Sequence, residues 1–220
     1  DDIEFDGKLH KRLLVIDHGF PVYGFQHGKN PTVFISSGMH CDEYTQIYAH
    51  LNFLKLISKE NNRPDFISIP FINPYGLSKF PKRDHSNRRW KSNSEGILQK
   101  TIREYLSEFN FNISIDMHED TDSSDLYIYE RRKNVTSLAH KIIDKLRDRY
   151  NISEKREIYG DSCIDGVINS NNVKEFTLES MMFNNSTYSL TTEVGGKLYP
   201  TQRIYCGYEI LKTVFNNTNL

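Results

Sequence analysis

The sequence has few cysteines, no excess of charge and no long apolar segment, and each shortage excludes a class of protein. Three cysteines among 220 residues are too few and too scattered for a disulfide framework, and they leave the compartment open. Lys and Arg total 28 against 29 Asp and Glu, a net charge of -1, so no overall field favours nucleic acid or an anionic membrane. No apolar run approaches the ~20 residues that cross a bilayer. We therefore expect no nucleic-acid partner and no membrane span.

Apolar and aromatic residues are sufficient for a buried core. Hydrophobic residues make up 37% of the chain and aromatic residues 12%, with 13 Tyr and 13 Phe. A chain of 220 residues suits one domain that folds without disulfide or metal staples. The sequence shows no repeat of fixed period and no linker-like segment. These features predict a single domain over residues 1–220.

Short apolar runs alternate with segments of helical periodicity along most of the chain. The first thirty residues mix apolar runs with Gly and Pro, which is typical of antiparallel strands and tight turns. Buried strands are predicted at 31–36, 65–74, 111–119, 126–130 and 187–194. Helices are predicted at 43–56, 97–109, 134–150, 172–183 and 199–215, with a loop or two short strands at 151–172. This alternation predicts an α/β fold, a three-layer α/β/α sandwich with a mixed, mainly parallel sheet and N-terminal antiparallel edge strands.

Three of the predicted strands end in imidazole or carboxylate side chains. His40 and Glu43 lie in SSGMHCDEYT after the strand at 31–36, His118 ends the strand at 111–119, and Glu193 ends that at 187–194. In open α/β sheets, ligands bind beyond the carboxyl ends of the strands. Structural alternatives exist, because an acidic residue in a first helical turn favours the helix dipole without any chemistry. The convergence of three strands favours a metal site.

The residue types at these strand ends match a catalytic zinc site. Two His and one Glu form an established ligand set that leaves a position for water, so we assign His40, Glu43 and His118 as ligands of one Zn²⁺. Zinc lowers the pKa of its bound water toward ~7, and Glu193 is then the candidate to transfer that water's proton to a leaving amine. Asp116, two residues before His118, either orients its imidazole or forms a cap or pair elsewhere.

Five short motifs resemble, in the same order, those of the zinc carboxypeptidase family (the M14 or funnelin group). HxxE alone is a weak signal, but the ordered set is specific and spans residues 33 to 205. The motifs are HCDE at 40–43, INPYG at 72–76, SNRRW at 86–90, IDMHE at 115–119 and TTEVGG at 191–196. The resemblance implies that His40, Glu43 and His118 bind the metal and that Glu193 is the catalytic glutamate, as their residue types also indicate.

The resemblance also implies roles for residues of the polar loop at 76–96. The family's asparagine and arginine that hold the substrate's terminal carboxylate fall on Asn87 and Arg88, with Arg89 as the alternative register. The arginine that polarises the scissile carbonyl falls nearest to Arg83. A guanidinium can hold a carboxylate through two parallel hydrogen bonds, and a second cation can stabilise an oxyanion. A solvated basic loop is the alternative interpretation.

The sequence departs from the family pattern at two places. The loop between INPYG and SNRRW is shorter than is usual in the family, which weakens the assignment of Arg83. The family's substrate-capping tyrosine, expected some twenty residues before the base, has no match; Tyr159 and Tyr188 are candidate substitutes, although a core or surface role is expected for each. Cys41 lies between two ligands and is interpreted as a bystander.

The sequence leaves three functions to compare. The first is a zinc metallocarboxypeptidase that acts on a peptide. The second is an N-acyl amino acid deacylase of the aspartoacylase and succinylglutamate desuccinylase type, a branch that commonly carries an added C-terminal β domain. Only one predicted helix follows Glu193, which favours the peptidase. The third is a non-catalytic metal-binding homologue, which the retained Glu193 disfavours.

Overall fold

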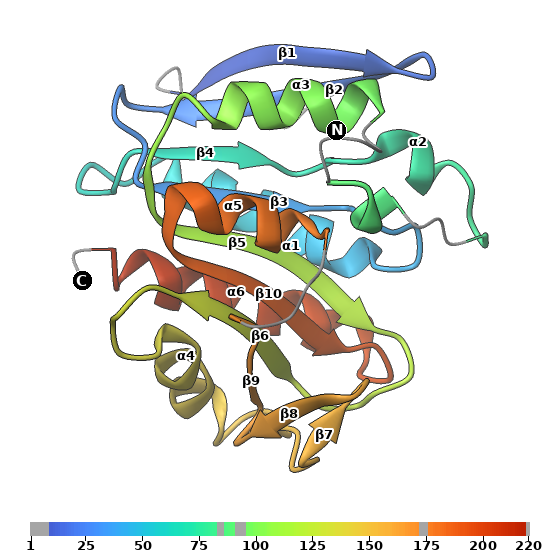
Figure 1. Cartoon of the computed structure of the whole chain (residues 1–220), viewed down its shortest axis with the longest axis vertical. Coiled ribbons are helices and arrows are strands. Elements are labelled where there is room, and N and C mark those ends of the chain that lie inside the picture. The colour runs from blue at the N-terminus through green and yellow to red at the C-terminus, as the bar shows by residue number, and fades with distance from the viewer. Residues whose placement is uncertain (1–8, 83–85, 91–95, 172–175, 219–220) are drawn as a thin grey trace.

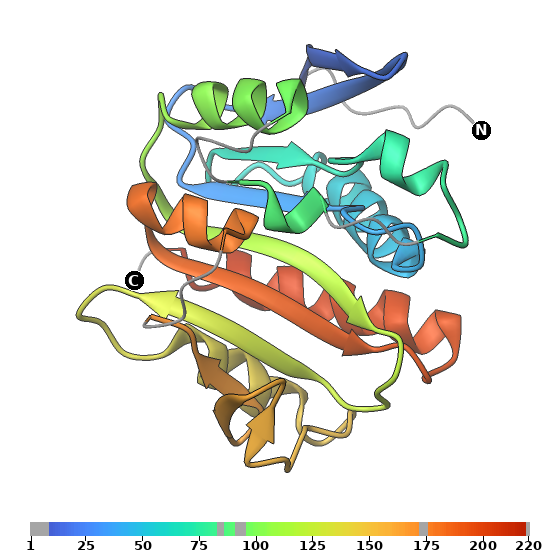
Figure 2. The same cartoon turned by 45° about the vertical axis from the view of Figure 1, so that its right-hand side comes forward.

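A sheet of ten strands runs through the computed structural model, with helices on both of its faces (Figures 1 and 2). The structure describes residues 9–82, 86–90, 96–171 and 176–218. The strands are β1 (His10–Asp17), β2 (Phe20–His27), β3 (Val33–Ser37), β4 (Phe66–Ile69), β5 (Phe111–Asp120), β6 (Tyr127–Arg132), β7 (Glu157–Ile158), β8 (Asp161–Ile164), β9 (Val167–Asn169) and β10 (Ser186–Gly195). The helices are α1 (Tyr44–Ile57), α2 (Pro74–Leu77), η1 (Ser86–Arg88), α3 (Ile97–Leu106), α4 (Leu138–Leu146), α5 (Leu178–Met182), η2 (Phe183–Asn185) and α6 (Pro200–Phe215). This architecture confirms the three-layer α/β/α sandwich.

The sheet is mixed, and its parallel part forms the centre. The strand order is β1-β2-β4-β3-β5-β10-β6-β9-β8-β7. Strands β4, β3, β5 and β10 are parallel neighbours, as are β6 and β9. The predicted N-terminal edge hairpin is β1 and β2, which pair antiparallel, and the other edge is the antiparallel set β9, β8 and β7. The carboxyl ends of β3, β5 and β10 therefore meet at one edge of the sheet, as the strand-end residues require.

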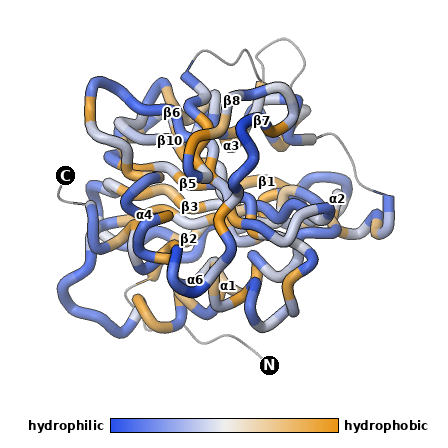
Figure 3. Tube along the Cα trace, turned by 90° about the horizontal axis from the view of Figure 1, so that it is seen from below, coloured by the Kyte–Doolittle hydropathy of each residue, from blue (hydrophilic) through white to orange (hydrophobic). Residues whose placement is uncertain are grey.

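Alternating side chains of the central strands build one apolar core on each face. In β3, Val33 and Ile35 belong to the cluster that includes Phe53 of α1, whereas Phe34 belongs to the cluster that includes Ile102 of α3. A strand buried on both faces favours apolar side chains at successive positions, which explains the continuous runs in the sequence. Figure 3 shows the hydrophilic segments mainly in the outer loops. No helix in the described ranges has both the length and the apolar character to span a membrane.

Several predicted segments differ from the structure in their extent. The strand predicted at 65–74 is only β4, at Phe66–Ile69, and Pro74 instead begins α2, which Asn73 caps. The helix predicted at 134–150 is α4, and it begins only at Leu138 because the Ser137 hydroxyl caps the N–H of His140. The segment at 151–172 forms three short strands rather than two. The helix predicted at 172–183 is the five-residue α5, capped by Thr177, and residues 172–175 lie outside the described part of the chain. Side-chain caps thus shortened both helices.

Candidate active site

The three predicted metal ligands meet in a buried cluster at the carboxyl ends of β3 and β5. His40 Nδ1 lies 2.7 Å from Glu43 Oε1, and His118 Nδ1 lies 2.7 Å from Glu43 Oε2. The two imidazole rings lie 5.0 Å apart, centroid to centroid. One potential ligand atom from each residue lies within 4.8 Å of the others. The cluster therefore offers two imidazole nitrogens and a carboxylate to a single point.

A tight turn after β3 presents His40, and the INPYG segment holds that turn in place. Gly38 has a φ of 74°, a left-handed conformation that glycine adopts without strain. A Cβ there would lie 3.1 Å from the carbonyl oxygen of Pro70. The Asn73 amide donates to the carbonyl of Met39 at 2.9 Å. The asparagine of INPYG is thus a structural support for the loop that carries the first ligand.

The side chain of Glu43 does not cap the helix that follows it, so helix capping does not account for this residue. It occupies the N-cap position of α1 but makes no capping hydrogen bond with its side chain. Glu119 of β5 replaces it, because its Oε1 accepts the N–H of Thr45 at 2.9 Å, and its Oε2 accepts a hydrogen bond from Arg203 of α6. The Glu43 carboxylate is thereby left to face His40 and His118.

The electrostatics of the cluster fit a bound cation. Burial raises the pKa of Glu43, but the imidazoles of His118 and His40 outweigh this effect and hold the pKa well below its ordinary value. Burial lowers the pKa of His118, but the carboxylates of Glu43 and Asp116 raise it well above its ordinary value. The two carboxylates therefore require compensating positive charge in a buried place. A divalent metal that displaces protons would supply it, and the donor set suits Zn²⁺.

Asp116 lies where the orienting interpretation requires it. Its Oδ2 lies 2.7 Å from Nε2 of His118, and its Oδ1 accepts a hydrogen bond of 2.7 Å from the Ser36 hydroxyl. Both contacts are buried, and Ser36 belongs to the neighbouring strand β3. This arrangement turns the opposite ring nitrogen, Nδ1, toward Glu43. The structure favours orientation of His118 over a cap or pair elsewhere.

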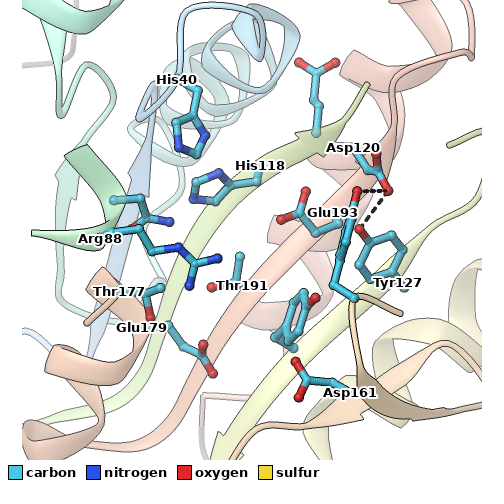
Figure 4. A pocket seen from close by; sticks show the side chains of 14 residues that line it. His40, Arg88, His118, Asp120, Tyr127, Asp161, Thr177, Glu179, Thr191 and Glu193 are labelled. Atoms are coloured by element: carbon cyan, nitrogen blue, oxygen red, sulfur yellow. Dashed lines mark hydrogen bonds between the residues drawn. The ribbon is translucent and has the colours of Figure 1, made fainter. Parts of the chain in front are cut away.

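A cavity of about 430 Å³ opens beside the cluster, and most of the remaining predicted residues line it (Figure 4). Glu193 of β10 lies directly opposite His118 of β5 and opposite Tyr127 of β6 in the strand register. The lining residues are His40, Asn87, Arg88, His118, Glu119, Asp120, Tyr127, Tyr129, Tyr159, Asp161, Thr177, Glu179, Thr191 and Glu193. The sheet register thus places a carboxylate in the cavity next to His118, a predicted metal ligand.

The structure separates the candidate arginines of the polar loop. Asn87 and Arg88 line the cavity, whereas Arg89, the alternative register, is not among the lining residues. The Asn87 side-chain oxygen accepts the N–H of Leu178 at 3.2 Å, which ties the short helix η1 to the start of α5. Arg83 lies outside the described residues. The structure therefore brings Asn87 and Arg88, but not Arg89, to the same cavity as Glu193.

The two candidate tyrosines have different environments. Tyr188 is buried in the core, and its hydroxyl donates to the carbonyl of Thr136 at 3.0 Å, so it has the expected core role. Tyr159 lines the cavity from the turn between β7 and β8, and its hydroxyl lies 3.5 Å from Oδ2 of Asp120. Cys41 is buried outside the ligand cluster, in agreement with its interpretation as a bystander.

The sequence did not reveal several polar residues around the site. Glu119 depends on Arg203, which is 84 positions away, and no local pattern indicates such a pair. Glu179 lines the cavity, accepts a hydrogen bond of 2.6 Å from the Ser170 hydroxyl and lies 3.5 Å from Nε of Arg131. The only local signal was the acidic run after His118, which ends at Asp120. These residues were identifiable only from the packing of distant segments.

Solved structures share this fold, whereas sequence comparisons give no match. No family model matches the chain, and no curated protein matches it. The structure of a candidate metallopeptidase from Shewanella amazonensis superposes with a TM-score of 0.82 at 20% identity, over 96% of this chain and 87% of that one. A metallo-carboxypeptidase from Burkholderia cenocepacia superposes with a TM-score of 0.70 at 13% identity, over 97% of this chain and 65% of that one.

A third structure contains a small ligand. It is a metallo-carboxypeptidase from Pseudomonas aeruginosa in complex with (2-guanidinoethylmercapto)succinic acid, with a TM-score of 0.70, 11% identity, and coverage of 97% of this chain and 65% of that one. At these identities the comparisons establish the fold. The chain therefore has the metallo-carboxypeptidase fold, and the family resemblance seen in the sequence motifs is confirmed at the level of the fold.

Proposed function

We propose that the protein is a zinc metallocarboxypeptidase, which hydrolyses the amide bond next to the terminal carboxylate of a peptide. The observation that carries the proposal is the shared cavity. His40 and His118, which form a cluster with the buried Glu43, line one cavity together with Glu193 and Arg88. These are the ligands, the proton-transfer group and the carboxylate-binding group that such a hydrolysis needs.

Each residue has a distinct part in the proposed reaction. A zinc ion at the cluster would supply Lewis acidity toward the scissile carbonyl and an attacking water. Arg88 binds the substrate's terminal carboxylate through parallel hydrogen bonds, assisted by Asn87, and so places the adjacent amide beside Glu193. Glu193 accepts the proton of the attacking water and transfers it to the leaving amine. Asp116 keeps the ring of His118 in its orientation. Arg83 is the proposed donor to the carbonyl oxygen.

The decisive experiment is the substitution Glu193→Gln with zinc content measured in parallel. We expect kcat to fall by roughly 10² to 10⁴ fold, the usual contribution of general acid and base catalysis, while bound zinc is unchanged. Glu104→Gln on the exposed surface of α3 is the matched control and should retain full activity. Equal turnover by Glu193→Gln and the control, with zinc bound in both, would falsify the mechanism.

The substrate panel distinguishes the proposed function from the alternatives. It contains peptides with free and amidated C-termini and a series of N-acyl amino acids, with the released amine as the signal. A peptidase of the proposed kind cleaves the free peptides and not the amidated ones. Cleavage of N-acyl amino acids alone identifies a deacylase, which would use the same residues. Zinc binding without hydrolysis of any compound identifies a non-catalytic homologue.

A further inference from the structure

The cavity has an uneven charge distribution along β10. Among the described residues that line it, Arg88 is the only lysine or arginine. In Figure 4, Arg88 lies on the side of Thr191 and Glu179, whereas Asp120 and Tyr127 lie on the far side of Glu193. The register agrees, because Asp120 of β5 lies opposite Gly195, two residues beyond Glu193. A substrate whose carboxylate meets Arg88 must therefore extend its other end toward Asp120.

Asp120 is held by neutral donors alone within the described part of the chain. Its Oδ2 accepts the hydroxyl of Tyr127 at 2.8 Å and that of Tyr159 at 3.5 Å, and its Oδ1 accepts the backbone N–H of Asp122 at 3.0 Å. Three donors fix the carboxylate in place, but none of them brings a positive charge. The side chain is only partly buried, so its charge remains accessible to a ligand in the cavity.

The ring of Tyr159 reaches the cavity from a backbone conformation that is unfavourable for a bulky residue. Tyr159 has a φ of 52° and Gly160 a φ of 91°, which is the pattern of a two-residue type I′ turn between β7 and β8. Asn or Asp normally occupies the first position of such a turn, and a bulky residue there is unusual. Tyr159 is also 76% exposed, so burial does not explain its presence. Such an outlier at a cavity is a reason to look for a function.

We infer that Asp120, with Tyr127 and Tyr159, selects substrates that carry a cationic group on the acyl side of the scissile bond. This inference rests on the proposed function for the direction of the substrate. A carboxylate and aromatic rings together recognise an ammonium group, through a charged hydrogen bond and cation–π contact. The cation is either the free α-ammonium of a short peptide or a basic side chain. Asp161, the residue after Gly160 at the start of β8, also lines the cavity and adds negative charge.

The field around Tyr127 is consistent with this inference. Burial, the negative charge of Glu193 and the hydrogen bond to Asp120 all raise the pKa of Tyr127. These effects agree with the role of its hydroxyl as a donor to Asp120 at 2.8 Å. The carboxylates of Glu193 and Asp120 both act on this one hydroxyl, so the end of the cavity beyond the catalytic position is negative and attracts cations.

The test compares three peptides of equal length that end in the same residue: one with a free N-terminus, one acetylated, and one acetylated with lysine before the scissile bond. We expect the wild type to favour a cationic peptide over the neutral one by roughly 10-fold in kcat/KM, since bonds to charged groups contribute this much. Asp120→Asn should abolish that preference, with a larger loss in kcat/KM for the cationic peptides than for the neutral one. Comparison of the peptide that has a free N-terminus with the lysine peptide shows whether the α-ammonium or the lysine side chain is recognised. Asp122→Asn, an exposed change of the same charge two residues away, should retain the preference.

A binding measurement separates failure of this inference from failure of the proposed function. The same peptides are titrated into zinc-loaded Glu193→Gln protein, with and without Asp120→Asn, by calorimetry. A charge preference that depends on Asp120, without hydrolysis by the wild type, supports the inference and rejects the peptidase. Hydrolysis without any charge preference, or an equal loss for all three peptides in Asp120→Asn, overturns the inference and leaves the peptidase intact.

Discussion

Asp116 determines which nitrogen of His118 faces the other ligands. With Nε2 engaged by Asp116 at 2.7 Å, Nδ1 is directed to Glu43. We predict that Asp116→Asn lowers the affinity for zinc by roughly 10 to 100 fold, as loss of such a partner does in other zinc sites. Competition with a chromophoric chelator at neutral pH measures this affinity. Asp144→Asn, at a side chain that is 70% exposed on α4, is the control. Equal affinities in the two variants would reject the orienting role.

Individual residues were predictable where their signal is local. His40, Glu43, His118 and Glu193 could be proposed because each follows an apolar run, and the ends of buried strands collect ligands. Glu119 could not be assigned its role, because the backbone N–H that it accepts belongs to Thr45, 74 positions earlier. The sequence indicated Tyr159 only weakly as a cavity residue, because its position at the cavity depends on the path of β7 and β8.

The turn between β3 and α1 is the element that presents His40. We predict that Gly38→Ala destabilises the fold by about 1 to 2 kcal/mol, because an L side chain is strained at positive φ, and that it also weakens zinc binding. Gly19→Ala is the matched control, since Gly19 has a φ of 84° but nothing within 4 Å of an added Cβ. Urea unfolding and chelator competition measure both effects. Weakened zinc binding in both variants would mean that the turn has no specific role.

A second element-level feature is a buried histidine between β3, β4 and α1. The hydroxyl of Ser37 donates to the carbonyl of Pro70, so it must accept from Nδ1 of His50 at 2.9 Å. Nε2 of His50 then accepts the hydroxyl of Ser68 at 2.8 Å. Burial lowers the pKa of His50 to about 3, against the attraction of Asp116. The network requires a neutral ring.

Acid should therefore destabilise the protein through His50. Between pH 6.5 and about 3 the unfolded chain binds a proton that the folded chain does not, so stability is full above pH 6.5 and falls by roughly 1.4 kcal/mol per pH unit below it. Urea unfolding from pH 7 to 5 measures this slope. His50→Gln should be less stable at pH 7 but show a shallower loss. His10→Gln, at an exposed position of β1, should keep the wild-type slope; a shallower slope there instead would contradict the assignment.

Element types were predicted better than element limits. The apolar runs that became β3, β5 and β10 have no alternative in a compact domain, so their type followed from composition. The first residues of the helices depended on particular side chains. Thr177 caps α5 and Ser137 caps α4, and both begin their helices later than hydrophobic periodicity indicates. Local hydrogen bonds from a backbone N–H to a side chain three residues earlier thus set the helix starts that the pattern of apolar residues left open.

At the scale of the whole molecule, zinc should couple to global stability. The predicted ligands come from the loop before α1 and from β5, so one ion would link this loop to a central strand of the sheet. Zinc at a hundred times its dissociation constant adds ~2.7 kcal/mol, which corresponds to roughly 5 to 10 °C in Tm for a chain of this size. Differential scanning calorimetry with and without zinc measures it. His118→Ala should remove the shift, and Mg²⁺, which prefers oxygen ligands, should not reproduce it. A shift that persists in His118→Ala would place the stabilising ion elsewhere.

The order of strands in space differs from their order in the chain, and this matters during synthesis. β10 fills the gap between β5 and β6, although it is the last strand to be made. On a ribosome that adds 5 to 20 residues per second, roughly 4 to 15 s separate the appearance of His118 from that of Glu193. For that interval the nascent polypeptide has His40, Glu43 and His118 but not Glu193, and the edges of β5 and β6 that pair with β10 are still open. Under the proposed function, the predicted metal site is therefore synthesised before the glutamate that would use it.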